Sequence, residues 1–258
     1  MTRRQAEIVD LVRANGFVPV ERLATQFAVT AQTIRREINH LCKLGLLRRT
    51  HGGVEQPVVN GNAHYSARRI LNLPAKRAIA NIVAGLVPDG ASLAFSIGTT
   101  SEIVMQALGG HAGLRVFTNN LNVAYAATDM TGCEVSIAGG RLRPGDRDVL
   151  GAAAEEFFAS YKVDFGILGV AGIEDDGTVL DFSEDEAGVR QAIIANCRHP
   201  ILVLDHSKIG RSAHVRGGHL RQAHTIVSDR PLPDTLQALL AGSSTVMLSP
   251  ISEAPCPQ

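Results

Sequence analysis

The stretch VTAQTIRREINHLCKLGLLRRTHGG, residues 29–53, predicts a helix, a short strand and a glycine turn in succession. Thr30 is a suitable N-cap, because its side-chain oxygen can accept a hydrogen bond from an N–H of the first turn. Apolar residues at helical spacing predict the buried face of this helix: Ile34, Ile38, Leu41 and Leu44. The opposite face is polar and basic: Gln32, Arg35, Arg36, Asn39 and Lys43. These two faces are typical of a recognition helix that enters the major groove of DNA.

The residues on either side of this helix complete a winged helix-turn-helix. Upstream, two further helices are predicted by apolar residues at helical spacing: Ile8, Leu11 and Val12 in the first, and Val20, Leu23, Ala24 and Phe27 in the second. Downstream, LLRRTHGGV at 46–54 predicts a strand that runs into the turn of a wing. Alternation along the strand sends Arg48 and Arg49 to opposite faces, so we expect one of them to contact phosphate directly. The arginines alone would fit an ordinary solvated surface, but together with the capped helix and the wing they favour DNA binding.

Charge is unevenly distributed along the 258 residues, although the formal net charge is zero. Residues 1–53 hold nine Lys/Arg and four Asp/Glu, a balance of +5, and the remaining residues hold sixteen and twenty-one, a balance of −5. A basic head on an acidic body indicates that a polyanion binds at the head only.

The chain is long enough for two domains, and its composition changes twice. We expect a winged helix-turn-helix DNA-binding domain over 1–55, a linker rich in Asn, Gly and Pro over 56–75, an α/β domain over 76–248 and a disordered tail over 249–258. In the α/β domain, helices are expected at 76–87, 101–108, 121–128, 151–160, 186–197 and 233–241, and strands at 91–96, 114–118, 133–138, 163–170, 200–205, 224–227 and 244–248. Such alternation predicts a mostly parallel sheet with helices on both faces.

Small and polar residues follow the strands of this predicted sheet. Ligands of such folds bind outside the carboxyl ends of the strands. The turn SIGTTSE, residues 96–102, offers backbone N–H groups and two threonine hydroxyls to an anion. The expected binding residues at this edge are Gly98, Thr99, Thr100, Asn119, Asn120, Gly139, Gly140, Arg141, Glu186 and Lys208. Gly, Asn and Thr are also common in turns for conformational reasons, but their succession favours a site for a small phosphorylated polyol. Residues 141–148, RLRPGDRD, fit a mobile lid and an ordinary charged loop equally well.

The run from Val29 to Gly53 resembles the helix-turn-helix signature of the DeoR family of bacterial transcriptional regulators. The body resembles the effector domain of that family, which is related in fold to ribose-5-phosphate isomerase, through TNNLNVA at 118–124, DFGILG at 164–169 and DHSKIGR at 205–211. The resemblance implies a cytoplasmic repressor of carbohydrate or glycerol metabolism genes that works as a dimer or tetramer. It leaves double-stranded operator DNA when a phosphorylated sugar or polyol binds, and glycerol-3-phosphate is the first expectation. The DNA-binding residues that the resemblance implies are Gln32, Thr33, Arg35 and Arg36, with Arg48, His51 and Gly52 at the wing.

Two residues depart from the family pattern: Ser96, where an aspartate is common, and Arg190, where a lysine is common. Phosphorylated sugars or polyols other than glycerol-3-phosphate therefore remain alternatives for the effector. Two alternatives also remain open: a sugar-phosphate isomerase-like enzyme with a DNA-binding head, and a regulator with a vestigial pocket that responds to a partner protein. Isomerisation needs a general base, for which Glu186, Asp181, Asp205 and Lys208 are candidates. Because Ser96 replaces a carboxylate and no lysine occurs in AGGRLRPGD at 138–146, we expect no catalytic residues.

Metal, cofactor and membrane functions find no support in the sequence. The four cysteines form no C-x-x-C pair, and the five histidines from His199 to His224 include no i, i+4 pair of the kind that binds zinc on a helix. The N-terminus lacks the apolar segment of a signal peptide, and the longest apolar run is too short to span a bilayer. We therefore expect a soluble, intracellular protein without a metal ion, a cofactor or a membrane partner.

Overall fold

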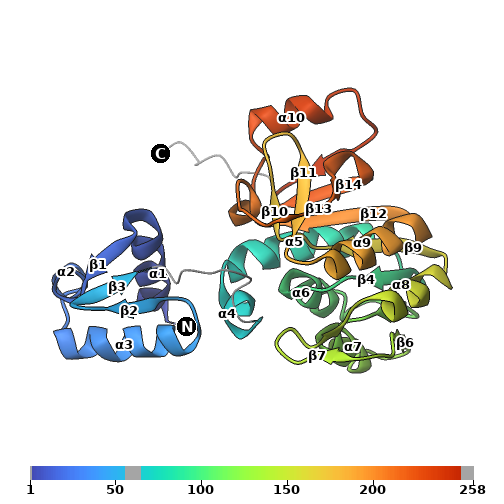
Figure 1. The fold of residues 1–258 in the computed structure, drawn as a ribbon. Coiled ribbons are helices and arrows are strands. Elements are labelled where there is room, and N and C mark those ends of the chain that lie inside the picture. The colour runs from blue at the N-terminus through green and yellow to red at the C-terminus, as the bar shows by residue number, and fades with distance from the viewer. Residues whose placement is uncertain (1, 56–64, 251–258) are drawn as a thin grey trace, which may run out of the picture. The chain divides into compact units, whose positions relative to one another are not determined.

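The computed structural model of the protein describes residues 2–55 and 65–250, and it divides the chain into two compact units at the junction of Leu71 and Asn72 (Figure 1). Within the described residues, no helix is both long enough and apolar enough to cross a membrane. Each unit has its own hydrophobic core.

The first unit contains the expected three helices and a small antiparallel sheet. The helices are α1 (Arg3–Asn15), α2 (Val20–Gln26) and α3 (Ala31–Lys43), and the strands β1 (Phe17–Pro19), β2 (Arg48–Thr50) and β3 (Gly53–Glu55) pair in the order β1-β3-β2. Thr30 caps α3 as predicted, since its Oγ1 accepts a hydrogen bond of 3.2 Å from the Thr33 N–H. The predicted face of α3 is buried at Ile34, Ile38 and Leu41, while Leu44, at the C-cap, is only half-buried.

The second unit is built on a parallel sheet of seven strands. The strands lie in the order β15-β14-β12-β9-β4-β5-β6, and every neighbouring pair is parallel. They are β4 (Ser92–Phe95), β5 (Arg115–Thr118), β6 (Glu134–Ile137), β9 (Val163–Leu168), β12 (Cys197–Leu204), β14 (Thr225–Ser228) and β15 (Val246–Leu248). All seven correspond to predicted strands, because each is an apolar run flanked by turn residues.

Helices cover both faces of this sheet, as predicted (Figure 1). Residues of α5 (Leu73–Leu86), α6 (Thr99–Ala107) and α7 (Leu121–Thr128) pack in one core cluster, and residues of α8 (Ala152–Ala159), α9 (Glu184–Asn196) and α10 (Asp234–Leu240) pack in another. The strands alternate between the two clusters: Ile201 and Val203 of β12 belong to the first, and Leu202 and Leu204 belong to the second. This alternation follows from the period of two along a strand.

The order of the strands reverses next to β4. From β4 the chain proceeds outward through β5 to β6, and it then returns to place β9 on the other side of β4. Such a reversal leaves a crevice at the carboxyl ends of the two strands, where ligands of open α/β sheets bind. The SIGTTSE turn follows β4 directly and therefore lies at this position.

Several short elements were not expected from the sequence. They are the hairpin of β7 (Leu142–Arg143) and β8 (Asp148–Val149) and a three-stranded antiparallel sheet of β10 (Gly172–Ile173), β11 (Thr178–Asp181) and β13 (Val215–His219). Part of the expected linker is helical, since α4 (Tyr65–Ile70) and the start of α5 fall within 65–75. Ala67 of α4 joins the core of the first unit, which explains why this part is ordered. Residues 56–64 of the linker and 251–258 of the expected tail lie outside the described residues.

Candidate functional site

The exposed face of α3 carries the residues expected to bind DNA. Gln32, Arg35 and Arg36 are exposed, and Thr33 is half-buried with its hydroxyl 3.0 Å from that of Thr30. At the wing, His51 and Gly52 are exposed, and Gly52 has a φ of +78°, which a residue with a Cβ adopts at a cost. The structure thus presents the predicted residues on the solvent side of α3 and on the turn between β2 and β3.

The arginines of this surface differ in their partners. Arg48 donates from Nε to Glu55 at 2.6 Å, and Arg49 donates to Asn39 of α3 at 3.2 Å, so the two side chains point in opposite directions as predicted. Among the described residues, the one ion-pair partner of Arg35 is Glu21, at 4.0 Å. For the Arg36 guanidinium, no ion pair or hydrogen bond is found within residues 2–55 and 65–250. Among the arginines of this face, Arg36 therefore has the fewest hydrogen bonds and ion pairs to other described residues.

A partly buried ion pair links α3 to α1. Glu37 lies on the inner side of α3, and its carboxylate accepts hydrogen bonds of 2.9 and 2.7 Å from Nε and Nη2 of Arg4. These hydrogen bonds raise the pKa of Arg4 above its ordinary value. Sequence reasoning missed this pair, although Glu37 lies three residues after Ile34 and four before Leu41, a spacing that puts it on the same side of the helix.

In the second unit, the turn after β4 has the features of an anion site. Ser96 is buried, and its N–H donates to the Ile167 carbonyl of β9 at 3.0 Å. Gly98 has a φ of +118° and begins α6 without a side-chain cap. Thr99 and Thr100 are buried in the first turn of α6. The positive end of the helix dipole at such an N-terminus favours a bound anion.

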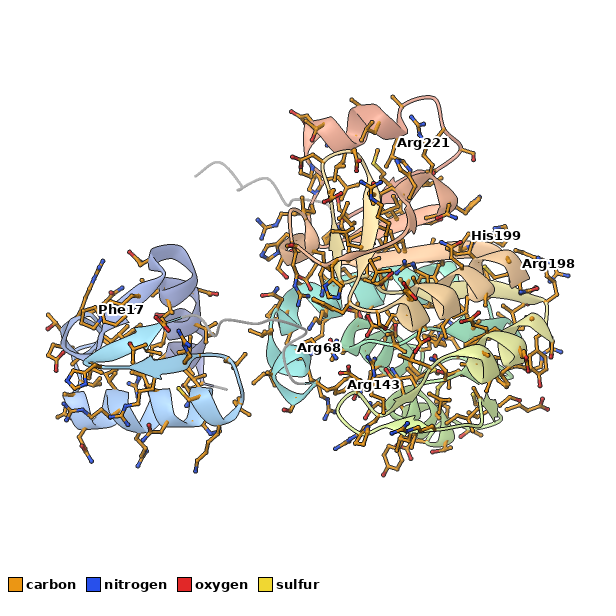
Figure 2. The ribbon with its side chains drawn as sticks, in the orientation of Figure 1. Phe17, Arg68, Arg143, Arg198, His199 and Arg221 are labelled. Atoms are coloured by element: carbon orange, nitrogen blue, oxygen red, sulfur yellow. The ribbon has the colours of Figure 1, made fainter. Side chains whose placement is uncertain are left out.

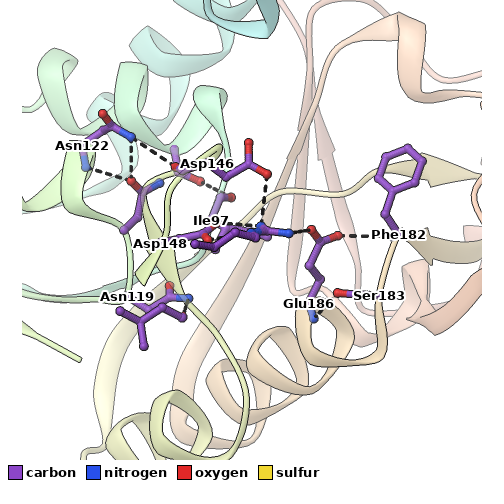
Figure 3. Close-up of polar contacts among 12 residues, drawn as sticks. Ile97, Asn119, Asn122, Asp146, Asp148, Phe182, Ser183 and Glu186 are labelled. Atoms are coloured by element: carbon purple, nitrogen blue, oxygen red, sulfur yellow. Dashed lines mark hydrogen bonds and ion pairs between the residues drawn. The ribbon is translucent and has the colours of Figure 1, made fainter. Parts of the chain in front are cut away.

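Asn119 and Asn120, which follow β5, have incomplete hydrogen bonding. Both residues are fully buried. Asn119 donates from Nδ2 to the Val149 carbonyl at 2.7 Å, and Asn120 caps α7 by accepting from the Asn122 N–H at 2.9 Å (Figure 3). The other amide atoms, Asn119 Oδ1 and Asn120 Nδ2, have no hydrogen-bond partner among the described residues. Because unpaired buried polar atoms are costly, they indicate that a ligand or a water completes the site.

The glycine-rich turn after β6 leads into the β7–β8 hairpin. Gly139, Gly140 and Arg141 are exposed, and no contact of the Arg141 guanidinium is found within the described residues. Arg143, which sequence reasoning did not name and which is labelled in Figure 2, is the arginine of this hairpin that forms ion pairs with Asp148 and Glu186. It is the cross-strand partner of Asp148 and donates to it from Nε and Nη2, at 2.8 Å each. The Pro-Gly turn of RLRPGDRD was the available signal, since it sets Arg143 opposite Asp148.

Arg143 also links the hairpin to α9. Its Nη1 donates to Glu186 at 2.7 Å, and Asp146 lies 3.2 Å from Nη2 (Figure 3). Burial lowers the pKa of Arg143, but the hydrogen bonds to Asp148 and Glu186 outweigh this and raise it. Burial raises the pKa of Asp148, and the hydrogen bond from Arg143 opposes the change only in part.

Glu186 has a structural role in addition to this pairing. Its N–H donates to Oγ of Ser183, the N-cap of α9, at 3.3 Å, and its Oε2 accepts from the Phe182 N–H at 3.2 Å, so Glu186 and Ser183 together hold the start of α9. One turn later, Arg190 is buried and paired with Asp181 through two hydrogen bonds, and it donates to the Gly217 carbonyl at 2.8 Å. The guanidinium is thus held within the protein. Burial raises the pKa of Asp181, against the effect of Arg190.

Lys208 lies in a short 3-10 helix (His206–Lys208) that follows β12. It is half-buried near the carboxylate of Asp205, which also accepts a hydrogen bond of 2.8 Å from Asn72 Nδ2. Burial opposes ionisation of Asp205, but the charge of Lys208 and the hydrogen bonds from Ser207 and Asn72 hold its pKa below the ordinary value. Asn72 is the first residue of the second unit. Its contact with Asp205 therefore anchors the start of this unit at the carboxyl edge of the sheet.

Comparisons with known proteins agree with this division into two units. The model of the DeoR-like helix-turn-helix domain matches residues 4–57, and the model of the DeoR C terminal sensor domain matches residues 71–230. The chain is 40% identical over 93% of its length, and 95% of the other protein, to the glycerol-3-phosphate regulon repressor of Escherichia coli K12. It is 43% identical over 84% of its length, and 85% of the other protein, to the repressor of the same name from Haemophilus influenzae.

Other similarities are weaker. The HTH-type transcriptional repressor CsqR of E. coli K12 is 34% identical over 97% of this chain and 96% of its own. Among solved structures, a ribose 5-phosphate isomerase from Methanocaldococcus jannaschii has a TM-score of 0.39 and 14% identity, covering 54% of this chain and 55% of that one. These three relatives, each of which matches more than four fifths of the chain, are named as repressors and not as enzymes.

Proposed function

The chain belongs to the DeoR family of transcriptional regulators, and from this premise we propose that it is a repressor whose hold on operator DNA is released by a phosphorylated polyol or sugar. Glycerol-3-phosphate is the first candidate for the effector, since two similar proteins are named as repressors of the glycerol-3-phosphate regulon. The regulated genes then belong to carbohydrate or glycerol metabolism, and the protein acts in the cytoplasm.

The observation that carries the DNA-binding part is the geometry of α3. A capped helix presents Gln32, Arg35 and Arg36 to solvent, while its other face is locked into the core of the unit. Residues near the N-terminus of such a helix read base edges, and a basic wing contacts phosphate. We assign base or phosphate contacts to Gln32, Thr33, Arg35 and Arg36, and phosphate contacts to Arg48, His51 and the backbone at Gly52.

The effector part is supported by the carboxyl edge of β4 and β5. The phosphate is assigned to the N-terminus of α6, at Gly98, Thr99 and Thr100, because no side chain caps this helix and the positive end of a helix binds anions. The unpaired amide atoms of Asn119 and Asn120 are assigned to other polar groups of the same ligand. Glu186, Lys208, Gly139, Gly140 and Arg141 remain proposed contributors around this edge.

Operator binding is proposed to require at least two copies of the chain. Helix-turn-helix proteins typically bind two half-sites one helical turn apart, so a dimer or tetramer presents two heads at a fixed spacing. Effector binding then lowers operator affinity by favouring an arrangement of the heads that does not fit the DNA. Typical coupling factors are about 5–150-fold. The isomerase-like alternative is disfavoured, since the relatives similar over nearly the whole chain are repressors.

The test uses DNA selected by the purified protein from a random duplex library and labelled for fluorescence anisotropy. Saturating glycerol-3-phosphate is expected to weaken binding at least fivefold. Arg36→Ala is expected to weaken DNA binding at least tenfold, because it removes a charge that no described residue neutralises. The same variant should keep the thermal stabilisation that the effector gives, since Arg36 lies in the other unit.

Three results would contradict the proposal. If no sugar phosphate or polyol phosphate at saturating concentration changes the operator affinity, the proposed class of effector is wrong. If Arg36→Ala binds DNA with the same affinity as the wild-type protein, the assignment of this surface to DNA binding is wrong. Turnover of a sugar phosphate by the purified protein would support the enzyme reading instead.

A further inference from the structure

Arg143 and the three carboxylates around it form a compact charged group at the edge of the sheet. We call Arg143, Asp146, Asp148 and Glu186 the Arg143 cluster. The positive charge of Arg143 and the two buried carboxylates, Asp148 and Glu186, already give a sum of −1 without Asp146. Asp148 and Glu186 are 1% and 5% exposed, so water screens their charges weakly. The cluster therefore disfavours a negatively charged group at the same place, even though it contains an arginine.

The cluster adjoins the unpaired amides. Asp148 forms a β-bridge with Asn120, and the next residue, Val149, donates its N–H to the Asn119 carbonyl at 2.8 Å (Figure 3). Asn119 Oδ1 is an acceptor without a donor, and Asn120 Nδ2 is a donor without an acceptor, among the described residues. A hydroxyl group satisfies both, because it donates one hydrogen bond and accepts others. A carboxylate satisfies only the amide N–H, because it has no proton to donate.

The N-terminus of α6 has the opposite preference. No side chain caps this helix, and the positive end of its dipole favours an anion. The carboxyl edge of the sheet thus contains one place suited to a phosphate and one suited to an uncharged hydroxyl. A ligand that uses both must be charged at one end only.

We propose that the Arg143 cluster makes the sensor selective for polyol monophosphates with a free hydroxyl end and excludes phosphates that carry a second anionic group. This inference rests on the proposed function, since it requires a phosphorylated small molecule at this edge. Arg143 acts as a positioning residue: it holds Asp148 and Glu186 in place through its hydrogen bonds and leaves the selection to the carboxylates.

Two probes of equal length separate the possibilities. Glycerol-3-phosphate ends in a hydroxymethyl group, and 3-phosphoglycerate ends in a carboxylate at the same position. Isothermal titration of the full-length protein is expected to give at least tenfold tighter binding of glycerol-3-phosphate, a difference of about 1.4 kcal/mol. Inorganic phosphate serves as the third probe, because it reports on the phosphate position alone.

Glu186→Gln tests the role of charge. Glutamine can keep the cap of α9, since its amide oxygen still accepts from the Phe182 N–H. We expect the preference for glycerol-3-phosphate over 3-phosphoglycerate to fall at least tenfold, with inorganic phosphate binding changed less than threefold. Asp146→Asn, a second variant on the hairpin turn, should lower the preference by a smaller factor. Arg198→Gln, which breaks an exposed ion pair with Asp164, is the matched control and should leave all three affinities unchanged.

The outcomes distinguish this inference from the proposed function. If glycerol-3-phosphate binds but 3-phosphoglycerate binds equally well, the selectivity is absent and only this inference fails. The same holds if both carboxylate variants fold and keep the wild-type preference. If none of the three phosphates binds to the wild-type protein, the proposed effector class fails, and this inference fails with it.

Discussion

Asp205 shows how a single buried carboxylate is kept ionised at the carboxyl edge of the sheet. Lys208 and the hydrogen bonds from Ser207 and Asn72 hold its pKa below the ordinary value despite burial. The unfolded chain has a carboxyl pKa of about 3.9. Because the folded pKa is depressed, Asp205 contributes stability that is complete well above pH 4 and is lost as the pH falls through the folded pKa.

Asp205→Asn is therefore expected to lower the free energy of unfolding at pH 7. The difference from the wild-type protein should stay constant from about pH 6 to 8 and shrink below about pH 4, because protonation then removes the same charge from the wild-type protein. Urea unfolding at a series of pH values measures this directly. A difference that does not change between pH 7 and pH 3 would show that the amide disturbs packing and that charge is not the cause.

The packing of α9 on β9 depends on a close approach at Gly166. An ideal Cβ built at this glycine would lie 2.8 Å from both Cys197 Sγ and Ile193 Cγ2. Both neighbours belong to the core on that face of the sheet. The helix therefore sits at a distance from the strand that leaves no room for a methyl group.

Gly166→Ala is expected to cost about 1–3 kcal/mol of stability, since added volume in a packed core forces neighbours to shift. Chemical denaturation of the second unit measures the loss. Gly85→Ala is the matched control, because Gly85 is exposed on α5 and a Cβ there would meet nothing within 4 Å. Adding Cys197→Ala to Gly166→Ala should restore part of the stability. Equal effects of Gly85→Ala and Gly166→Ala would contradict this account of the interface.

The elements that sequence reasoning found and missed differ in how locally they are specified. The parallel strands and α3 were predictable, because each is marked by its own apolar pattern and caps. The β11–β13 pairing was not, since Leu180 pairs with Arg216 far along the chain and the strand contains Gly217 and Gly218. Sequence reasoning selected Arg141 and not Arg143 as an effector-binding residue, because its only criterion was position directly after a predicted strand. The pairing across β7 and β8 that selects Arg143 depends on the register of the hairpin.

At the scale of the whole molecule, the uneven charge predicts that DNA binding and effector binding depend differently on salt concentration. Residues 1–53 carry nine positive and four negative groups, a net of +5, while the rest of the chain carries −5. DNA affinity is thus expected to depend steeply on salt, since each neutralised phosphate contributes about −0.9 to the slope of log affinity against log salt concentration. With at least four phosphates contacted, the slope is about −3.6 or steeper.

Fluorescence anisotropy between 50 and 300 mM KCl, about the range over which such slopes are usually read, measures this dependence. Glycerol-3-phosphate affinity over the same range should change much less, because its assigned site is buried and belongs to the acidic unit. A DNA slope near zero would mean that the basic surface of the first unit does not meet phosphate.

The separate cores of the two units have a consequence for how such proteins diversify. The residues that support α3, among them Leu23, Ile38 and Val54, pack with one another in the core of the first unit. Mutation can therefore alter which DNA sequence is recognised without disturbing the fold around the effector, and the reverse also holds. Descendants of one ancestral gene can in this way acquire new target promoters and new metabolic signals independently, by point mutation or by recombination between Leu71 and Asn72.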